Sequence, residues 1–387
     1  MRIGTRQVGG GAGVYVIAEL GVNHDGDAAR AIDLVDAAAH AGADAVKFQL
    51  FRAEMLMSAA SELAAYQRSA GESDPREMLR RLELPIEAMA RAAQRAHDHG
   101  LHAIVTPFSV ELVPAAEAMG VWDAYKTASP DVVHRPLLDA LAATGMPMIV
   151  STGAADLAEV SRAAAWLADA TRAGRVAMLQ CVSCYPTADA DAAIRGMDAI
   201  RTVFAGPVGY SDHTRGVDTG GVAASLGAEV LEKHLTLSRS LPGPDHAASL
   251  EPDEFRAYTT LARDESAMRA WMSDEHAEDG SSRGARRGTR RELAVREDPR
   301  WGPPAKVVLA CERDVRRVSR QSIVLTRSLR AGERIGLGDI TFKRPGLGLE
   351  PWRVEEVVGR RARHDIDADR PIALEDIEAG APAEATR

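Results

Sequence analysis

The chain has 387 residues, a formal net charge of −9 and 45% hydrophobic residues, so it is long enough for one large core and a smaller second domain. Its acidic balance argues against nucleic acid or a membrane surface as the main partner. No run of about 18 apolar residues predicts a membrane span. Three cysteines and an N-terminal segment without an apolar signal core predict a cytoplasmic protein without structural disulfides.

Eight short apolar runs recur in the first 235 residues, at 14–20, 44–50, 101–108, 121–129, 146–153, 175–183, 207–213 and 228–235. Each has the length and composition of a strand that is buried on both faces. An Ala-rich stretch that ends in glycine precedes seven of them, at Gly42, Gly100, Gly120, Gly145, Gly174, Gly206 and Gly227. Glycine in that position indicates a left-handed helix C-cap.

Eight strands alternating with helices predict a (β/α)8 TIM barrel. A doubly wound open sheet is the alternative, but no Gly-x-Gly-x-x-Gly turn follows the first strand. A barrel gathers its chemistry at the C-terminal ends of its strands, and nearly every predicted strand ends in polar residues. They are Glu19, Lys47, Gln49, Thr106, Lys126, Ser129, Ser151, Thr152, Ser183, Tyr185, Ser211, His213, Glu232 and His234.

The last run, EVLEKHLTL at 229–237, carries three charged or polar residues in a row within an apolar frame. Side chains two apart on a strand share a face, so Glu232 and His234 are expected to face the barrel mouth. Lys233 then points towards the helices, and we expect it to be structural and paired with a carboxylate. His213 ends the neighbouring strand, so the two imidazoles are either ligands of a divalent cation or a hydrogen-bonding pair.

Glu232 beside such a metal is a candidate general base, and Glu19 on the first strand is a second candidate acid or base. Only five of the 47 basic residues are lysines, and Lys47 and Lys126 fall at strand ends. Together with the hydroxyls at matching strand ends, these ammonium groups predict a pocket for an anion that carries a phosphate and a carboxylate. The Cys181-x-x-Cys184 spacing is not interpreted as a metal or redox site, because the two sulfurs of an extended strand would project to different sides.

The C-terminal third has a different organisation. Residues 276–315 are rich in charge, Gly and Pro and are predicted to be a linker between a catalytic domain (1–275) and a small β-rich domain (316–387). Within the small domain, LRAGERIGLGDI from Leu329 resembles IDADRPIALEDI from Ile366 at an offset of 37. This internal repeat predicts a pseudo-symmetric β unit.

The chain resembles the sialic acid synthase (N-acetylneuraminate synthase) family. The resemblance is carried by IAELGVNHDGD, AVKFQLF, TPFS, YKTAS, STG, LQCVSCYPT, GYSDHT and EKHLTL followed by PGPDHAAS, in family order. SRQSIVLTRSLRAGERIGLGDITFKRPG is similar to the antifreeze-like (SAF) domain that follows the barrel in that family.

The resemblance implies that phosphoenolpyruvate condenses with the open-chain aldehyde of an N-acyl amino sugar. His213 and His234 would bind manganese or a similar ion, with magnesium and cobalt as alternatives. Glu232 would be the proton-transfer partner. Phosphoenolpyruvate would be held by Lys47, Thr106, Lys126, Ser129, Ser151, Ser183 and Ser211. The sugar or the intermediate would contact Glu19, Gln49, Asp131, Tyr185 and Asp245.

The resemblance also implies a homodimer in which the SAF domain of one subunit contributes an arginine to the sugar site of the other, and Arg320 is the candidate. The segment departs from the family at Gln321, where a second arginine is usual. The strand-four loop reads Ala-Ser-Pro-Asp up to Asp131 instead of Gly-Ser-Gly-Glu, and the loop YQRSAGESDPREM lacks the family's sugar-binding asparagine. These departures fall on the acceptor side, so the sequence leaves the sugar open.

Three alternatives remain at this point. The chain could be a related phosphoenolpyruvate-condensing synthase that acts on another aldose in surface-polysaccharide or secondary-metabolite biosynthesis. It could be a Schiff-base aldolase that uses Lys47 or Lys126 as the nucleophile. It could also be a non-catalytic carbohydrate-binding or assembly protein that keeps the same fold.

Overall fold

Eight parallel strands close into a barrel in a computed structural model that describes residues 1–268 and 298–378. The strand order around the barrel is β10-β3-β4-β5-β6-β7-β8-β9. The bounds are β3 Tyr15–Gly21, β4 Ala45–Leu50, β5 His102–Pro107, β6 Ala124–Thr127, β7 Met148–Ser151, β8 Val176–Cys181, β9 Val208–Asp212 and β10 Val230–His234. Seven predicted apolar runs contain one of these strands, the run at 14–20 ends one residue before β3 does, and the predicted TIM barrel is confirmed.

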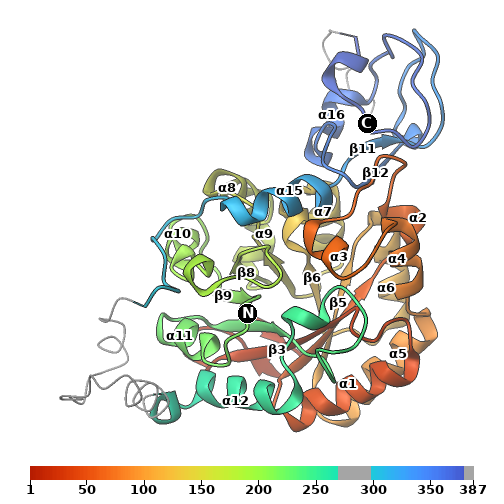
Figure 1. Cartoon of the computed structure of the whole chain (residues 1–387). Helices are drawn as coiled ribbons and strands as arrows, with labels where there is room; N and C mark the ends of the chain where they lie inside the picture. Colours follow the sequence, from red (N-terminus) through yellow and green to blue (C-terminus); the bar gives the residue numbers. More distant parts are fainter. Residues whose placement is uncertain (269–297, 379–387) are drawn as a thin grey trace.

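Helices surround the strands on the outside of the barrel (Figure 1). They are α1 Ala28–His40, α5 Ile86–Asp98, α6 Val113–Met119, α7 Arg135–Ala143, α8 Leu157–Trp166, α9 Ala168–Arg172, α10 Gly196–Arg201, α11 Thr219–Ser225 and α12 Pro252–Arg263. Three short helices between β4 and α5 lie instead at the C-terminal ends of the strands: α2 Ala53–Leu56, α3 Ala65–Ser69 and α4 Pro75–Leu82. Helix α1 shows why the outer helices form: Asp27 caps its N-terminus by accepting from the N–H groups of Ala29 and Arg30, and Leu34 and Ala38 are buried one turn apart.

The glycines that precede the strands end the helices mostly as predicted. Gly42, Gly100, Gly120, Gly145, Gly174 and Gly227 all have positive φ. Gly206 has no positive φ, so the C-cap predicted there is wrong. A Cβ at this position would lie 2.7 Å from the Val176 carbonyl oxygen, so close packing is the reason for glycine there.

Alternation along the strands separates two cores. On β3, Tyr15 and Ile17 pack in the cluster inside the barrel, whereas Val16 and Ala18 pack in the larger cluster beneath the helices. Glu19 continues the inward-facing series. The same alternation therefore delivers polar side chains to the mouth at the C-terminal ends of the strands.

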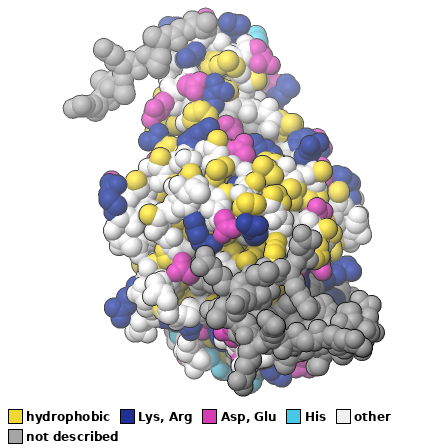
Figure 2. Space-filling view, turned by 90° about the vertical axis from the view of Figure 1, so that its left-hand side faces the viewer, with side chains coloured by type: hydrophobic (Ala, Val, Ile, Leu, Met, Phe, Trp, Pro, Cys, Tyr) yellow, Lys and Arg dark blue, Asp and Glu magenta, His cyan; other side chains and the backbone are white. Residues whose placement is uncertain are grey.

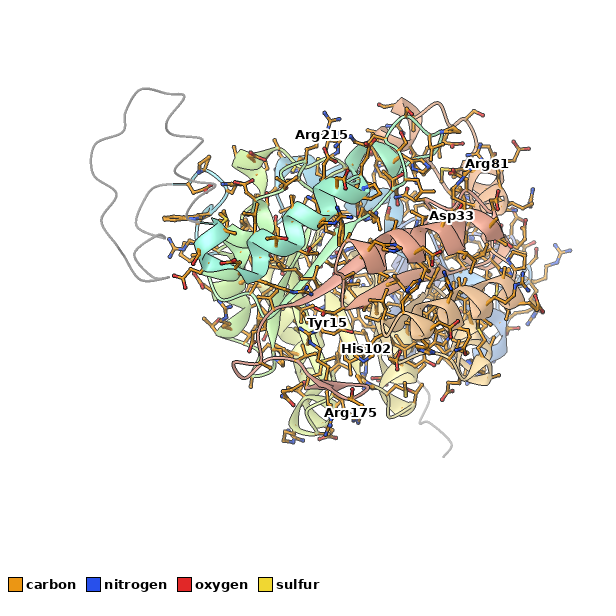
Figure 3. All side chains as sticks on the ribbon, turned by 90° about the horizontal axis from the view of Figure 1, so that it is seen from below. Tyr15, Asp33, Arg81, His102, Arg175 and Arg215 are labelled. Atoms are coloured by element: carbon orange, nitrogen blue, oxygen red, sulfur yellow. The ribbon has the colours of Figure 1, made fainter. Side chains whose placement is uncertain are left out.

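The opposite end of the barrel is closed by a hairpin of β1 Arg2–Ile3 and β2 Arg6–Gln7. Ile3 is fully buried there. The Tyr15 hydroxyl lies 2.8 Å from Nδ1 of His102, the first residue of β5 at the same end of the barrel (Figure 3). Ile3 and Val8 pack there in the same cluster as Tyr15 and Ile17, so apolar side chains fill this end of the barrel.

The C-terminal part stands above the barrel in Figure 1, with α15 Arg313–Ser319 between the two. It contains the antiparallel pair β11 Ser322–Leu325 and β12 Ile340–Lys343, and the short helix α16 Val354–Val357. Helix α15 spans the predicted boundary at 315/316. Residues 276–297 of the predicted linker lie outside the described residues.

The predicted internal repeat has a structural counterpart. Asp339 accepts a hydrogen bond from the N–H of Gly336 at 2.9 Å, and Asp376, at the offset of 37, accepts one from Ala373 at 2.7 Å. The first residues of the two copies, Leu329 and Ile366, pair with each other in an antiparallel bridge. The repeat therefore builds two matching turns around one small core.

The surface in Figure 2 carries basic and acidic side chains that are interspersed on the face shown. Within residues 1–268 and 298–378, no helix combines the length and the apolar character that crossing a membrane requires.

Candidate active site

A cavity opens at the C-terminal ends of the barrel strands, and most of the predicted site residues line it. They are Glu19, Lys47, Gln49, Thr106, Lys126, Ser129, Ser151, Ser183, Tyr185, Ser211, His213, Glu232, His234 and Asp245. Asp131 and Arg320 are the two predicted residues that do not line it.

Lys47 lies at the centre of the charged groups. Its Nζ is 3.0 Å from Glu19 Oε2 and 3.1 Å from Glu232 Oε1. Gln49 donates a hydrogen bond to the other oxygen of Glu19 at 2.8 Å, and Ser211 donates to Glu232 at 3.1 Å. All these side chains come from the adjacent strands β3, β4, β9 and β10, which explains how residues 185 positions apart meet.

The two carboxyl groups beside Lys47 differ in acidity. Burial opposes ionisation of Glu232, but the ammonium groups of Lys126 and Lys47 outweigh it and hold its pKa at about 2. Burial raises the pKa of Glu19, and Lys47 offsets only part of this effect. Glu232 is therefore the ionised member of the pair, whereas Glu19 binds a proton more readily.

Lys126, on β6, has a different environment. Its Nζ donates to Ser151 Oγ at 2.5 Å and to the Thr127 carbonyl at 3.1 Å, and lies 3.5 Å from Glu232. Burial lowers the pKa of Lys126 to about 8, although the charge of Glu232 opposes this. The ammonium group is thus present at neutral pH but lost more easily than that of an ordinary lysine.

Hydroxyl groups converge on the same part of the cavity, above Gly153. A Cβ at Gly153 would lie 2.3 Å from Ser183 Oγ and 2.8 Å from Ser129 Oγ, so only glycine leaves this space open. Ser183 Oγ and Thr106 Oγ1 are buried and have no hydrogen-bond partner within the described part of the chain. Such unpaired hydroxyls are costly unless a ligand satisfies them.

The two histidines lie together as predicted, with ring centroids 5.4 Å apart. His213 Nδ1 donates to the Val182 carbonyl at 2.8 Å, which fixes Nε2 as the free acceptor of its neutral ring. His234 Nδ1 is buried without a hydrogen-bond partner in the described residues, 3.8 Å from Asp245 Oδ2. Two imidazoles with free acceptors fit a divalent cation whose other positions are taken by water or substrate.

Three or more His, Cys, Asp or Glu side chains do not gather into a metal-binding group anywhere in residues 1–268 or 298–378. The ion therefore remains a prediction that rests on the imidazole pair.

The far side of the cavity is apolar. The Tyr185 ring packs at a tilt against His213, with ring centroids 4.2 Å apart, and the centroid of the Tyr66 ring lies 4.9 Å from that of Tyr185. Apolar side chains from the loops after β3, β4 and β5 complete this wall: Val22, Phe51, Leu56, Met78, Leu79, Leu82 and Phe108. The cavity thus has a charged half at the barrel axis and an apolar half beneath the C-terminal part.

Comparison with known proteins shows the family to which this chain belongs. The NeuB family profile matches residues 34–272, more than half of the chain. The chain belongs to the NeuB family. The SAF domain family matches residues 320–378 of this NeuB family member, which confirms the resemblance seen in both parts of the sequence.

Named relatives cover nearly the whole chain. An N,N'-diacetyllegionaminic acid synthase from Legionella pneumophila is 34% identical over 370 residues, covering 94% of this chain and 95% of the relative. The crystal structure of spore coat polysaccharide biosynthesis protein SpsE from Bacillus subtilis has a TM-score of 0.76 and 28% identity, covering 98% of this chain and 99% of that one.

An N-acetylneuraminic acid synthetase from Leptospira borgpetersenii serovar Hardjo-bovis, solved in complex with citrate, has a TM-score of 0.61 and 28% identity, covering 76% of this chain and 94% of that one. The NeuB family member described here is therefore similar to synthases of more than one nonulosonic acid, and the family assignment supports an enzyme.

The SAF-domain arginine predicted from the sequence lies elsewhere in this NeuB family member. Arg320 donates to both oxygens of Glu159, at 2.7 and 2.9 Å, and is buried outside the cavity of its own barrel. Asp131 is also buried outside the cavity, where Gln321 donates to it at 3.1 Å. The substitution of Arg by Gln at 321 thus places a neutral donor against a carboxyl whose pKa burial raises to about 6.

Arg344 is the arginine at the cavity, and the sequence analysis did not single it out. It follows β12, and its backbone N–H and carbonyl bond to Leu56 and Ser58 of the barrel at 2.9 and 3.1 Å. Its guanidinium carbon lies 5.4 Å from the Phe108 ring centroid, and its Nε has no hydrogen-bond partner in the described residues. Arg344 falls within the TFKRPG stretch that carried the SAF resemblance, but only domain docking reveals its position.

Lys233 points away from the cavity, as the strand alternation predicted. Its Nζ donates to Asp212 Oδ2 at 3.0 Å, and both side chains are fully buried. Cys181 and Cys184 are free thiols, in agreement with the interpretation that the C-x-x-C spacing forms no disulfide. The polar residues of β10 therefore serve two different sites: Glu232 and His234 line the cavity, and Lys233 forms a buried ion pair on the other face of the strand.

Proposed function

We propose that the protein condenses phosphoenolpyruvate with the open-chain aldehyde of an N-acyl amino sugar, forming a sialic-acid-like 2-keto acid and releasing inorganic phosphate. C3 of phosphoenolpyruvate forms the new bond with the aldehyde carbon, water adds at C2, and phosphate leaves with cleavage of its C–O bond. One observation carries the proposal: two ammonium groups, converging hydroxyls and two imidazoles share one cavity in a NeuB family member.

The charged half of the cavity suits the donor. Lys47 and Lys126 would bind the carboxylate and phosphate of phosphoenolpyruvate, and the unpaired hydroxyls of Thr106 and Ser183 would satisfy its remaining oxygens. Glu232 stays ionised between the two lysines. An ionised carboxylate at this position can accept a proton during the reaction, and it balances the positive charge of the two lysines once phosphate has left.

His213 and His234 would hold a divalent cation, manganese in our proposal, and such an ion supplies a Lewis acid for the aldehyde oxygen of the acceptor. Tyr185, packed against His213, would orient the sugar beside it. The higher pKa of Glu19 suits a proton donor to the alkoxide that forms from the aldehyde.

The apolar half of the cavity suits the acceptor. Its wall of aliphatic and aromatic side chains has room for the acyl methyl groups of an amino sugar, and Arg344 is positioned to bind an acyl carbonyl. We therefore favour an acceptor whose distal end carries acyl groups or deoxy carbons over one rich in hydroxyls.

Phosphate release from phosphoenolpyruvate, measured against a panel of 2-acylamino and 2,4-diacylamino sugars, tests the proposal. Release should require both an acceptor and a divalent ion, should stop with EDTA and should return with manganese. Turnover that chelation leaves unchanged, or release without any sugar, would refute it. The His213→Ala variant should need more manganese than the wild type for half-maximal activity.

A Schiff-base aldolase remains the second candidate because the pKa of Lys126 is lowered to about 8. Lys47 suits this role less well, since Glu19 and Glu232 outweigh burial and raise its pKa. Borohydride trapping of a substrate adduct on Lys126 would favour the aldolase. A protein unchanged in mass after borohydride treatment with substrates supports the condensation.

The exchange of SAF domains in a homodimer is part of the proposal and has its own test. In the chain described here, Arg344 lies at the cavity of its own barrel. Mixing the Glu232→Gln and Arg344→Gln variants would restore activity if the domains exchange, because one site of the heterodimer would then be intact. No restoration is expected if each chain completes its own site.

A further inference from the structure

The loop after β7 is held from two sides by the segment that joins the barrel to the SAF domain. Glu312, immediately before α15, is fully buried and accepts the N–H of Ala154 at 2.6 Å and that of Ser183 at 2.8 Å, both on Oε1. From the other side, Arg316 and Arg320 donate to the Ala154 carbonyl at 2.6 and 3.1 Å.

The backbone of Ala154 has a strained conformation that depends on surrounding contacts. Its φ of 53° lies in the left-handed region, which costs a non-glycine residue on the order of 1 kcal/mol. Such a conformation persists only where surrounding contacts fix it, and at Ala154 the hydrogen bonds with Glu312, Arg316 and Arg320 do so. Glu159 pairs with both arginines and holds them in place.

The loop so fixed is the one that shapes the hydroxyl side of the cavity. Gly153 precedes Ala154 and lies against Ser183 Oγ and Ser129 Oγ. Ser151, at the end of β7, accepts from Lys126. Because a single carboxylate oxygen joins the backbones of Ala154 and Ser183, a shift of Glu312 changes the spacing between the β7 and β8 strand ends.

We propose that Glu312 is a positioning residue for the donor anion, and that the segment 312–320 sets the shape of the phosphate-binding half of the cavity. This inference rests on the proposed function, since it takes phosphoenolpyruvate as that anion. It assigns Arg320 a role in supporting the loop after β7. Glu312 itself does not line the cavity and makes no contact with the reacting atoms.

Replacement of Glu312 by Gln tests the inference. In the native chain, Glu312 Oε2 accepts the N–H of Leu309 at 2.9 Å. The side-chain oxygen of Gln at this position can still accept from the Ala154 and Ser183 N–H groups, but without a negative charge. The NH₂ group of Gln would then face the N–H of Leu309, so that two donors meet. We expect KM for phosphoenolpyruvate and Kd for inorganic phosphate to rise about 10-fold, the equivalent of one charged hydrogen bond. KM for the sugar should change less than about 2-fold, because the acceptor half lies elsewhere.

A matched pair on α15 provides the control and a second line of evidence if Glu312→Gln does not fold. Arg316→Lys removes a donor to Ala154, whereas Arg317→Lys alters a neighbouring arginine that pairs with Glu62 at 2.8 Å. We expect Arg316→Lys alone to raise KM for phosphoenolpyruvate.

Equal effects of the two α15 variants, or equal changes in KM for both substrates of the Glu312 variant, would overturn the inference. A wild-type protein that neither binds nor consumes phosphoenolpyruvate would overturn the proposed function and this inference together. A wild-type protein that does so, beside a Glu312→Gln variant with unaltered KM, would overturn the inference alone.

Discussion

Glu232 Oε1 lies 3.1 Å from Lys47 Nζ and 3.5 Å from Lys126 Nζ, so one carboxylate oxygen on β10 is shared by two ammonium groups from β4 and β6. This places one negative charge inside a pocket proposed for an anion. If the pocket binds phosphoenolpyruvate as proposed, the carboxylate would lower the affinity for it while favouring the charged form of both lysines in a buried site. A residue that weakens binding of the substrate while serving the reaction is expected to affect turnover and affinity in opposite directions.

The Glu232→Gln variant tests this balance. We expect kcat to fall about 100-fold or more, as for loss of a proton-transfer group, whereas KM for phosphoenolpyruvate should stay level or fall because a negative charge leaves the anion pocket. Steady-state phosphate release measures both. Glu229→Gln is the matched control, since Glu229 binds the N–H of Gly10 at the opposite rim; a loss of turnover in both variants would contradict the assignment.

Binding of phosphoenolpyruvate should weaken in alkaline solution because of Lys126. Its pKa is lowered to about 8 by burial, so the ammonium group loses its proton as the pH rises through that value and the pocket loses a positive charge. We expect KM for phosphoenolpyruvate to rise above about pH 8 in the wild type. The Lys126→Arg variant should lose this rise, because arginine stays protonated. A pH profile that is the same in both proteins would rule out Lys126 as its source.

Arg344 should affect the acceptor rather than the donor. Arg344→Gln is expected to raise KM for the sugar about 10-fold or more, the usual effect of a lost charged hydrogen bond, with little change in KM for phosphoenolpyruvate. Lys343→Gln provides the control, because Lys343 is the preceding residue and pairs with Asp369 at 2.7 Å away from the cavity. An unchanged KM for the sugar in the Arg344 variant would remove this residue from the acceptor site.

Lys233 should matter for stability and not for catalysis. Lys233→Met leaves the fully buried Asp212 without its ammonium partner, and we expect a loss of about 3–5 kcal/mol in the free energy of unfolding. The double variant Asp212→Asn, Lys233→Met should recover part of this loss, because no buried charge is then unpaired. Denaturant unfolding of the three proteins measures it, and a single variant as stable as the wild type would contradict the buried-pair argument.

The barrel and its polar rim follow from local patterns in the sequence. Apolar runs of strand length, a glycine before seven of them and the period of two along each strand together predict which residues face the mouth. That period alone predicts that Glu232 and His234 lie on one face of the strand and Lys233 on the other. The rule that chemistry lies at the C-terminal ends of barrel strands then brings Lys47 and His213, far apart in the chain, into one site.

The tertiary structure alone decided how the C-terminal part completes the cavity. Arg344 reaches the apolar half, Arg320 turns to Glu159, and Glu312 joins the loops after β7 and β8. These contacts span more than a hundred residues and depend on the angle at which one domain docks on another. No periodicity in the chain encodes that angle, because it is set by the packing of two separate surfaces, whereas the strand rim repeats one geometry eight times.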